Sequence, residues 1–216
     1  MTGTDTGVGK TLVSCALLYA FAARDKRVVG MKPVAAGCDD DKPNEDVQAL
    51  RAASNVLATL GQINPYSFLQ PVAPHIAASH AGVPINFERI VESYKELSTL
   101  ADIVIVEGAG GLLVPLGENT DMADLAARLE LPVILVVGMR LGCLNHALLT
   151  LSAIRSRGLH CAGWVANIMD PQQPFLQENI ESLKLRLHSP LLGIVPHQDN
   201  PDAKLAAPHL DISLLR

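Results

Sequence analysis

The sequence predicts an α/β fold of the P-loop NTPase type, a three-layer sandwich around a mainly parallel sheet, and three observations carry this prediction. The segment GTDTGVGKT at residues 3–11 has the composition of a phosphate-binding loop and leads directly into an apolar helical segment. Apolar runs of strand length recur about every 30 residues, each followed by a helical pattern. No repeat, low-complexity tract or linker divides the chain, so we expect a single domain over residues 1–216.

The phosphate loop is the first element with a chemical purpose. Its glycines can turn many backbone N–H groups toward one anion, because glycine adopts backbone conformations that other residues avoid. Lys10 supplies a positive charge for the β- and γ-phosphates of a nucleotide, and the hydroxyl of Thr11 is of the type that binds the accompanying Mg²⁺. The helix predicted over 11–24 adds roughly half a positive charge at its N-terminus. We therefore predict nucleotide binding at this end of the chain.

Two other interpretations of this segment stay open at this point. It can be a glycine-rich turn before a core helix, or a secretory signal with residues 12–22 as its apolar region, although only Lys10 is basic. Gly3 also lies one residue too early for the common phosphate-loop pattern, and only Met1 and Thr2 precede it. Because a buried strand normally leads into such a loop, we expect the first strand to be missing or truncated. Either the start of the chain was placed too late, or the sheet lacks a central member.

Composition and charge limit the classes of function. An apolar fraction of 49% is enough for a full core, and a net charge of -5 without any basic block argues against a nucleic-acid partner. No apolar run is long enough to span a membrane. The cysteines are far apart and form no CxxC pair, which predicts free thiols in a reducing cytoplasm. They are Cys15, Cys38, Cys143 and Cys161.

The next elements bring charged side chains toward the loop. A strand predicted over 27–34 ends in Lys-Pro and is expected to place Lys32 at the same sheet edge as the phosphate loop, with a solvated surface lysine as the alternative. The polar segment 37–44 contains three consecutive aspartates, which indicate a solvated loop. Asn44 then caps a helix whose acidic first turn contains Asp46.

The rest of the chain continues the alternation of strands and helices. Residues 64–84 are expected to form a loop with a short helix, in which His75 and His80 cap or pack, because no third metal ligand lies at a suitable spacing. Trp164 is expected in the core. The remaining predictions are helices over 86–100, 121–129, 173–187 and after Gly142, strands over 102–106, 132–137, 159–166 and 191–195, and a loop with an apolar tail over 197–216.

The strand over 102–106 is a continuous apolar run, typical of strands buried on both faces, and it ends at Glu107 before Gly-Ala-Gly-Gly. An acid at this end of a parallel strand faces the nucleotide crevice, where it can hold a carboxylate toward Mg²⁺. The following glycines let the backbone approach phosphate. A charged residue that merely ends a strand is the alternative. Further along, Gly142 precedes a helix with Asn145 in its first turn, and that helix N-terminus can hold an anion.

Six segments together carry a resemblance to a known family. They are GTDTGVGKT at 3–11, KPVAAG at 32–37, the turn at 44–46, VEGAGG at 106–111, PVILVVGMRLGCLNHALLT at 132–150 and GWVAN at 163–167. Over nearly its whole length the chain resembles the dethiobiotin synthetase family. The resemblance implies a cytoplasmic homodimer with a P-loop fold related to the nitrogenase iron protein group. It also implies ATP-dependent closure of the ureido ring of dethiobiotin from 7,8-diaminononanoate and CO₂, with release of ADP and phosphate, in biotin biosynthesis.

The same resemblance implies roles for single residues. Thr11, Asp46 and Glu107 would surround Mg²⁺, and Lys32 and Lys10 would be catalytic residues that flank the reacting carbamate and γ-phosphate. The nucleotide-binding residues would be Gly7, Val8, Gly9, Lys10, Thr11, Asp46, Glu107, Gly108, Ala109, Gly110, Asn167, Pro196, His197 and Gln198, with the asparagine reading adenine. The substrate-binding residues would be Thr6, Ala36, Gly142, Cys143 and Asn145. The last three would come from the neighbouring subunit.

The chain departs from the family pattern at some positions, and two rival functions stay open. Ala36 stands where a serine contacts substrate in the family, and Ile168 stands where an aspartate can stand. One rival is another P-loop amidoligase-like enzyme with a different acceptor. The other is a nucleotide-gated partition or scaffold ATPase of the same fold. The second class is expected to carry another lysine near the start of the loop, where this chain has Thr4, Asp5 and Thr6.

Overall fold

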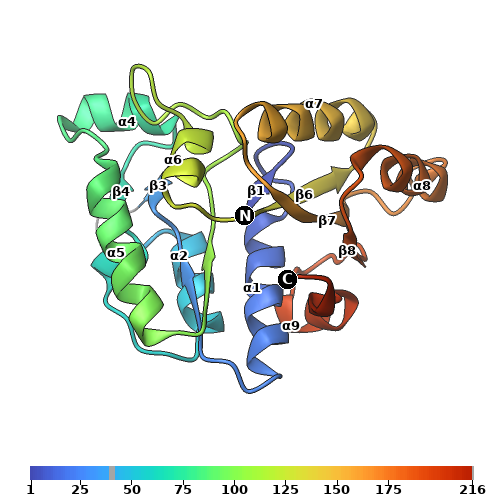
Figure 1. Ribbon diagram of the computed structural model, residues 1–216, viewed down its shortest axis with the longest axis horizontal. Coiled ribbons are helices and arrows are strands. Elements are labelled where there is room, and N and C mark those ends of the chain that lie inside the picture. The colour runs from blue at the N-terminus through green and yellow to red at the C-terminus, as the bar shows by residue number, and fades with distance from the viewer. Residues whose placement is uncertain (39–41, 216) are drawn as a thin grey trace.

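The structure is a computed structural model that describes residues 1–38 and 42–215, so the three consecutive aspartates lie outside the described residues. Its strands form a central layer between two layers of helices (Figure 1). The paired strands are all parallel and run in the orders β1-β6-β7-β8, β2-β5 and β3-β4. The strands are β1 (Thr2–Gly3), β2 (Val28–Met31), β3 (Val34–Ala36), β4 (Tyr66–Phe68), β5 (Ile103–Val106), β6 (Val133–Met139), β7 (Cys161–Ile168) and β8 (Leu191–Val195). The predicted α/β fold class is confirmed.

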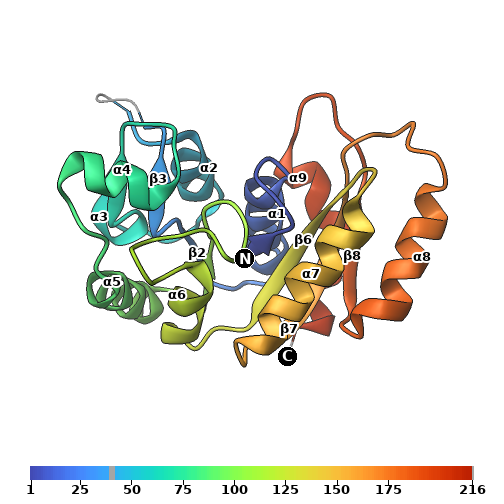
Figure 2. The ribbon, with the colours of Figure 1, turned by 90° about the horizontal axis from the view of Figure 1, so that it is seen from above.

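The helices cover both faces of the sheet, as Figure 2 shows from above. Helices α1, α2 and α9 lie on one face, and α5, α6, α7 and α8 lie on the other. The helices are α1 (Lys10–Ala22), α2 (Glu45–Ala53), α3 (Leu60–Ile63), α4 (Pro74–Ala81), α5 (Phe87–Leu100), α6 (Met122–Arg128), α7 (Cys143–Ser156), α8 (Leu176–Leu187) and α9 (Ala203–Ala206). The tail was predicted as a loop, but α9 and two 3-10 turns after it pack on α1.

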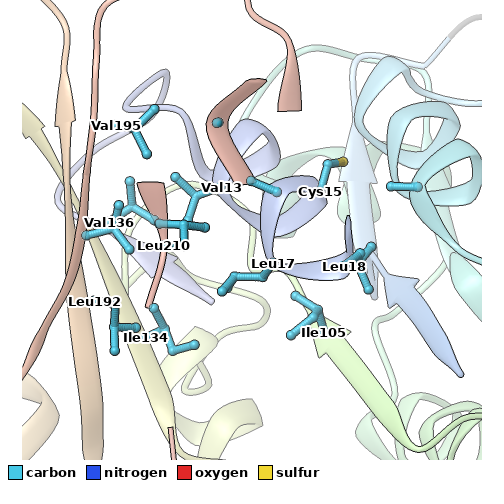
Figure 3. Close-up of a cluster of buried hydrophobic side chains, with 14 of the residues drawn as sticks. Val13, Cys15, Leu17, Leu18, Ile105, Ile134, Val136, Leu192, Val195 and Leu210 are labelled. Carbon is cyan, nitrogen blue, oxygen red and sulfur yellow. The ribbon is translucent and has the colours of Figure 1, made fainter. Parts of the chain in front are cut away.

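Alternate residues of the central strand β6 enter the two halves of the core, because successive side chains of a strand point to opposite faces. Ile134 and Val136 pack toward α1, whereas Leu135 packs toward α7. Helix α1 lies in the middle of its layer, and Figure 3 shows its Leu17 with Ile134 and Ile105 on either side. This packing fixes the start of α1, and therefore the phosphate loop, at the carboxyl end of the sheet.

The first strand is present but only two residues long, which agrees with the expectation that it is missing or truncated. Thr2 and Gly3 form β1 and pair with Leu135 and Val136 of β6 in the centre of the sheet. Because this strand is so short, its described links to β5 and to the segment after β5 are the backbone hydrogen bonds of Met1 with Val106 and Gly108 and one isolated bridge between Gly3 and Gly111. The sheet therefore divides into separate hydrogen-bonded units.

The prediction that the strand at 102–106 is buried on both faces is wrong for most of its length. Ile103, Val104 and Val106 are half-buried, and only Ile105 of β5 is fully buried. The edge of β5 that points toward β6 borders a space that the short β1 does not fill. The exposure of β5 is thus a consequence of the shortness of β1.

The strand predicted over 27–34 divides at Lys32 and Pro33. The N–H of Lys32 donates to the carbonyl oxygen of Ile63 at 2.8 Å, away from β5, and Pro33 has no N–H to continue a ladder. The chain then forms β3, which pairs with β4 in a small second sheet. The segment 64–84, predicted as a loop with a short helix, contains β4 as well as α4. Neither short strand was predicted, because three residues carry too little periodicity to detect.

Predictions about single residues have mixed outcomes. The side chain of Asn44 caps α2 by accepting a hydrogen bond from the N–H of Asp46 at 3.0 Å, and Trp164 is fully buried, so both predictions are confirmed. All four cysteines are free thiols. On α4, His75 is half-buried and His80 is exposed. Within the described ranges, no group of three His, Cys, Asp or Glu side chains could hold a metal ion, and no helix is long and apolar enough to cross a membrane.

Candidate active site

The phosphate loop connects β1 to α1. Gly7 and Gly9 have φ angles of 72° and 89°, in the region that favours glycine, and Gly9 is the N-cap of α1. A Cβ atom on Gly9 would lie 2.2 Å from Nδ2 of Asn167, whereas the space around Gly7 is open. The loop therefore needs glycine at position 9 for two separate reasons, its backbone conformation and its close contact with β7.

Two side chains from other parts of the chain hold the loop in place. The buried Asn167 of β7 donates from Nδ2 to the carbonyl oxygen of Val8 at 2.9 Å. Arg140, between β6 and α7, forms an ion pair with Asp5. In this structure the amide nitrogen of Asn167, which the resemblance implies as the adenine reader, is thus engaged by the loop itself.

Lys10 begins α1, and its ammonium group lies inside its own loop. Its Nζ donates to the carbonyl oxygen of Asp5 at 2.9 Å. Burial lowers the pKa of Lys10, and the charge of Lys32 lowers that pKa further, against the opposite effects of Glu107 and Asp46. A buried ammonium group close to a second one is stabilised by an anion, so the loop is electrostatically suited to a phosphate.

Thr11, Lys32, Asp46 and Glu107 form one hydrogen-bonded cluster beside the loop. The hydroxyl of Thr11 lies 2.7 Å from Oδ1 of Asp46 and 2.9 Å from Oε1 of Glu107. Nζ of Lys32 donates to Oδ2 of Asp46 at 2.8 Å and to Oε1 of Glu107 at 2.6 Å. The four residues come from α1, the link between β2 and β3, the first turn of α2 and the end of β5. The parallel sheet brings them together, because the carboxyl ends of its strands share one edge.

The charges of this cluster are strongly coupled. Burial by itself would lower the pKa of the Lys32 ammonium, but the carboxylates of Glu107 and Asp46 outweigh burial and raise that pKa. Burial would raise the pKa of Asp46, but Lys32 and the Thr11 hydroxyl hold it below its usual range. Glu107 is fully buried, and its Oε2 has no hydrogen-bond partner among the described residues. This buried oxygen is an acceptor available to a cation.

A cavity of about 520 Å³ opens beside the cluster. Residues from the loop, the cluster and the glycine-rich segment after β5 line it, including Thr6, Lys32, Ala36, Asp46, Val72 and Gly110. Val72 belongs to the segment 71–74, which follows β4 and includes the first residue of α4, and the sequence analysis did not associate this segment with the site. The segment contains two prolines, which indicate a loop, and its side chains have no acid–base or ligand groups that would indicate a functional site.

The other residues implied by the resemblance lie outside this cavity. Gly142 is the N-cap of α7 with a φ of 94°, and Asn145 is exposed in the first turn. The side chain of Cys143 is buried in the core, so only its backbone can face a ligand. Residues 196–198 follow β8 at the carboxyl edge of the sheet. Asn167 lies near the same edge, at the end of β7. None of these residues lines the 520 Å³ cavity.

The loop, the parallel sheet and the cluster around Thr11 define a P-loop nucleotide-binding protein, and a family model described as "AAA domain" matches residues 1–204. The ATP-dependent dethiobiotin synthetase BioD of Nitrosospira multiformis is 55% identical over 213 residues, covering 99% of this chain and 94% of the relative. The BioD protein of Aromatoleum aromaticum is 53% identical over 211 residues, covering 96% and 94%. The chain belongs to the ATP-dependent dethiobiotin synthetase family, which confirms the predicted family and enzyme class.

Solved structures of low sequence identity share the fold. The MinC:MinD cell division protein complex of Aquifex aeolicus matches with a TM-score of 0.61 at 14% identity, over 99% of this chain and 86% of that one. A ParA family ATPase of Chlorobium tepidum matches with a TM-score of 0.58 at 14% identity, over 98% and 89%. These similarities concern the arrangement of helices and strands alone.

Proposed function

We propose that the chain catalyses the ATP-dependent carboxylation and ring closure of 7,8-diaminononanoate to dethiobiotin, in biotin biosynthesis. The observation that carries this proposal is that one cluster of side chains borders both the 520 Å³ cavity and the phosphate loop. Lys32 and Asp46 line the cavity, and Asp46 also contacts the hydroxyl of Thr11 in the loop. A molecule in the cavity would therefore lie next to the phosphate end of a bound nucleotide. The names of the family members supply the reaction, and the cavity supplies space for its second substrate.

The charges of the site suit this reaction. One amine of the substrate adds CO₂ to give a carbamate, whose oxygen attacks the γ-phosphate and displaces ADP, so two anions must meet. The ammonium groups of Lys10 and Lys32 offset their repulsion. The second amine then displaces phosphate from the mixed anhydride within the same molecule, which is worth several kcal/mol when the reacting atoms lie about 3 Å apart. No side chain needs to act as a covalent nucleophile.

The residues around Thr11 fit a Mg²⁺ ion. They offer a hydroxyl and two carboxylates, the hard oxygens that this ion prefers, and Oε2 of Glu107 is buried with no partner in the part of the chain that the structure describes. We infer that Thr11, Asp46 and Glu107 would hold Mg²⁺ together with the nucleotide. The ion would supply positive charge for the phosphate oxygens, while Lys32 forms ion pairs with both carboxylates and holds the pKa of Asp46 below its usual range.

Glu107→Gln should raise the Mg²⁺ concentration needed for nucleotide binding by roughly 10-fold or more, because the amide oxygen is a weaker ligand than a carboxylate. The measurement is binding of a non-hydrolysable ATP analogue by calorimetry across a Mg²⁺ series. Glu88→Gln, which changes an exposed glutamate paired with Arg128, is the matched control and should leave the series unchanged. Equal Mg²⁺ dependence in both variants would remove Glu107 from the proposed ligands.

The proposal also gives roles to the remaining residues implied by the resemblance. Asn167 and residues 196–198 would line the nucleotide base, and Thr6 would contact the diamine from the loop. Ala36 lines the cavity with a methyl group, so a polar contact at that point would have to come from the backbone. Gly108, Ala109 and Gly110 would bring backbone groups close to phosphate.

We infer a single-domain, cytoplasmic homodimer in which the start of α7 in one subunit reaches the cavity of the other. Gly142, Cys143 and Asn145 would receive the substrate carboxylate there through the N-terminus of the helix. Leu141 is 98% exposed and Leu149 is 62% exposed, which leaves apolar side chains of this region available for a subunit contact. Sedimentation equilibrium that finds an active monomer would contradict the dimer.

ATP turnover by the purified chain should require both the diamine and bicarbonate, and the products should be dethiobiotin, ADP and phosphate in equal amounts. The measurement combines a phosphate-release assay with mass spectrometry of the products, and each substrate is omitted in turn. Hydrolysis that proceeds without the diamine would favour the partition or scaffold class. Turnover with another amine acceptor would favour an amidoligase-like enzyme.

A further inference from the structure

The phosphate loop contains an acidic residue, Asp5, close to its catalytic lysine. The backbone carbonyl oxygen of Asp5 accepts a hydrogen bond from Nζ of Lys10 at 2.9 Å. Burial and the charge of Lys32 lower the pKa of Lys10, and Asp5 is among the carboxylates that act against them. The charge of Asp5 therefore acts at the position of Lys10. Because like charges repel, an unpaired carboxylate here would oppose the phosphates of a nucleotide.

The carboxylate of Asp5 is engaged on two sides. It accepts a hydrogen bond from the N–H of Thr6 at 2.7 Å. It also forms an ion pair with Arg140, which lies 135 positions further along the chain. The N–H of Thr6, followed by the charges of Arg140 and His146, holds the pKa of Asp5 below its usual range. The carboxyl group is thus ionised near neutral pH, and Arg140 supplies the opposite charge.

The position of Arg140 follows from the way the loop lies on the end of β6. The N–H of Thr4 donates to the carbonyl oxygen of Val136 at 3.0 Å. A Cβ atom on Gly138 would lie 2.8 Å from Cγ1 of Val8, so the loop packs directly on the backbone of this strand. Figure 2 shows α1, which follows the loop, next to β6. Arg140 comes directly after β6, where its side chain meets the loop.

The backbone of Arg140 is also held by the start of α7. Its carbonyl oxygen accepts a hydrogen bond from the N–H of Cys143 at 3.0 Å. Gly142, with a φ of 94°, turns the chain into the helix between these two residues. Arg140 is therefore fixed by β6 on one side and by α7 on the other. Its ion pair with Asp5 connects the phosphate loop to two long elements of the fold.

The exposure of this ion pair indicates a local effect. The side chains of Arg140 and Asp5 are 46% and 47% exposed. Ion pairs with this exposure contribute little to the free energy of unfolding, because water and salt screen the charges. We therefore expect the loss of the pair to change the phosphate loop and to leave the overall fold intact.

We propose that Arg140 is a positioning residue for nucleotide binding, which neutralises the carboxylate of Asp5 and so keeps the phosphate loop attractive to an anion. Together with Arg140, the charges of Asp5 and Lys10 sum to one net positive charge, whereas Asp5 alone would cancel Lys10. Arg140 also keeps Asp5 in the orientation in which its carbonyl oxygen holds Lys10. This role rests on the nucleotide site of the proposed function, and the family resemblance assigns it to neither residue.

The test measures binding of a non-hydrolysable ATP analogue with Mg²⁺ by calorimetry. Arg140→Ala should weaken binding by at least ~10-fold, because it leaves a carboxylate unpaired beside the phosphates. Arg140→Lys, which keeps the charge, should weaken binding by no more than ~3-fold. Arg128→Ala, which removes an exposed arginine paired with Glu88, is the matched control and should leave binding unchanged. Unchanged binding in Arg140→Ala, or equal losses in the alanine and lysine variants, would overturn the proposal.

Asp5→Asn separates the effect of charge from a general loss of structure, because asparagine keeps the oxygen that accepts from Thr6 and removes the charge. In the double variant Asp5→Asn, Arg140→Ala, the affinity should return to within ~3-fold of the parent chain. A double variant as weak as Arg140→Ala would contradict the proposal, as would a thermal midpoint more than ~5 °C lower in Arg140→Ala. These measurements use the nucleotide alone, so a chain that binds it and forms no dethiobiotin would contradict only the proposed function.

Discussion

Lys32→Ala is expected to reduce dethiobiotin formation by roughly 10²–10³-fold or more while nucleotide binding stays measurable. The ammonium group of Lys32 lies against Asp46 and Glu107 and lines the 520 Å³ cavity, whereas in the proposed site the backbone of the phosphate loop and Lys10 would hold the nucleotide. Its charge is therefore needed most when the carbamate approaches the γ-phosphate, which is a transition-state interaction. The measurement is product formation by mass spectrometry beside ATP-analogue binding by calorimetry.

The same substitution also affects stability, so it needs a matched control. Without Lys32, the fully buried carboxylate of Glu107 loses its partner, at a cost of roughly 3–5 kcal/mol in the free energy of unfolding. The double variant Lys32→Met, Glu107→Gln removes both charges and should recover most of that stability without recovering synthesis. Lys26→Ala, at an exposed lysine, should change neither quantity. Synthesis that returns in the double variant would show that Lys32 acts through folding alone.

Gly9→Ala is expected to weaken ATP binding by at least ~100-fold, about 2.7 kcal/mol. The new Cβ would meet Nδ2 of Asn167 at 2.2 Å, and the backbone φ of 89° is strained for any residue with a side chain. Relief of the contact would have to move the loop away from β7 and break the hydrogen bond from Asn167 to Val8. Calorimetric titration with ATP measures the effect.

Substitutions at two other glycines distinguish the effect of the Cβ contact with Asn167 from the effect of the positive φ angle. Gly7→Ala has a similar φ of 72° but open space around its Cβ, so a loss of only about 1–2 kcal/mol is expected. Gly61→Ala meets no atom within 4 Å and should leave binding unchanged. In a chain that already carries Asn167→Ala, Gly9→Ala should cost less ATP affinity than it does in the parent chain, because the contact with Nδ2 is gone. If Gly7→Ala and Gly9→Ala prove equally harmful, the contact with Asn167 contributes nothing.

The long elements could be predicted because their signals are local. The apolar runs of β6, β7 and β8 and the helical periodicity of α5 are patterns of neighbouring residues. They can be recognised without knowing what these elements pack against. The cap by Asn44 is equally local, since its partner Asp46 is two residues away. Short elements such as β3 and β4 could not be predicted, because each exists only through its pairing with the other.

The candidate site divides in the same way. Gly9, Lys10 and Thr11 are adjacent in sequence, and Glu107 follows an obvious strand, so residue types and spacing identified them. The contact of Lys32 with Glu107 spans 75 positions, and the segment 71–74 has no chemical signature of its own. Such contacts depend on the order of the strands in the sheet, and this order cannot be inferred from any local pattern in the sequence.

By itself, the sequence determined the phosphate loop, the alternation of strands and helices, and the family. Each of these depends on patterns of residues that are close together in the sequence. The tertiary structure decided which charges meet. It set Lys32 between two carboxylates and buried Glu107 with one oxygen that has no partner within residues 1–38 and 42–215. It also joined β1 to β6 while leaving β5 beside an open space. The physical reason is that burial and electrostatic interaction depend on distance in space, which the packing of the three layers sets.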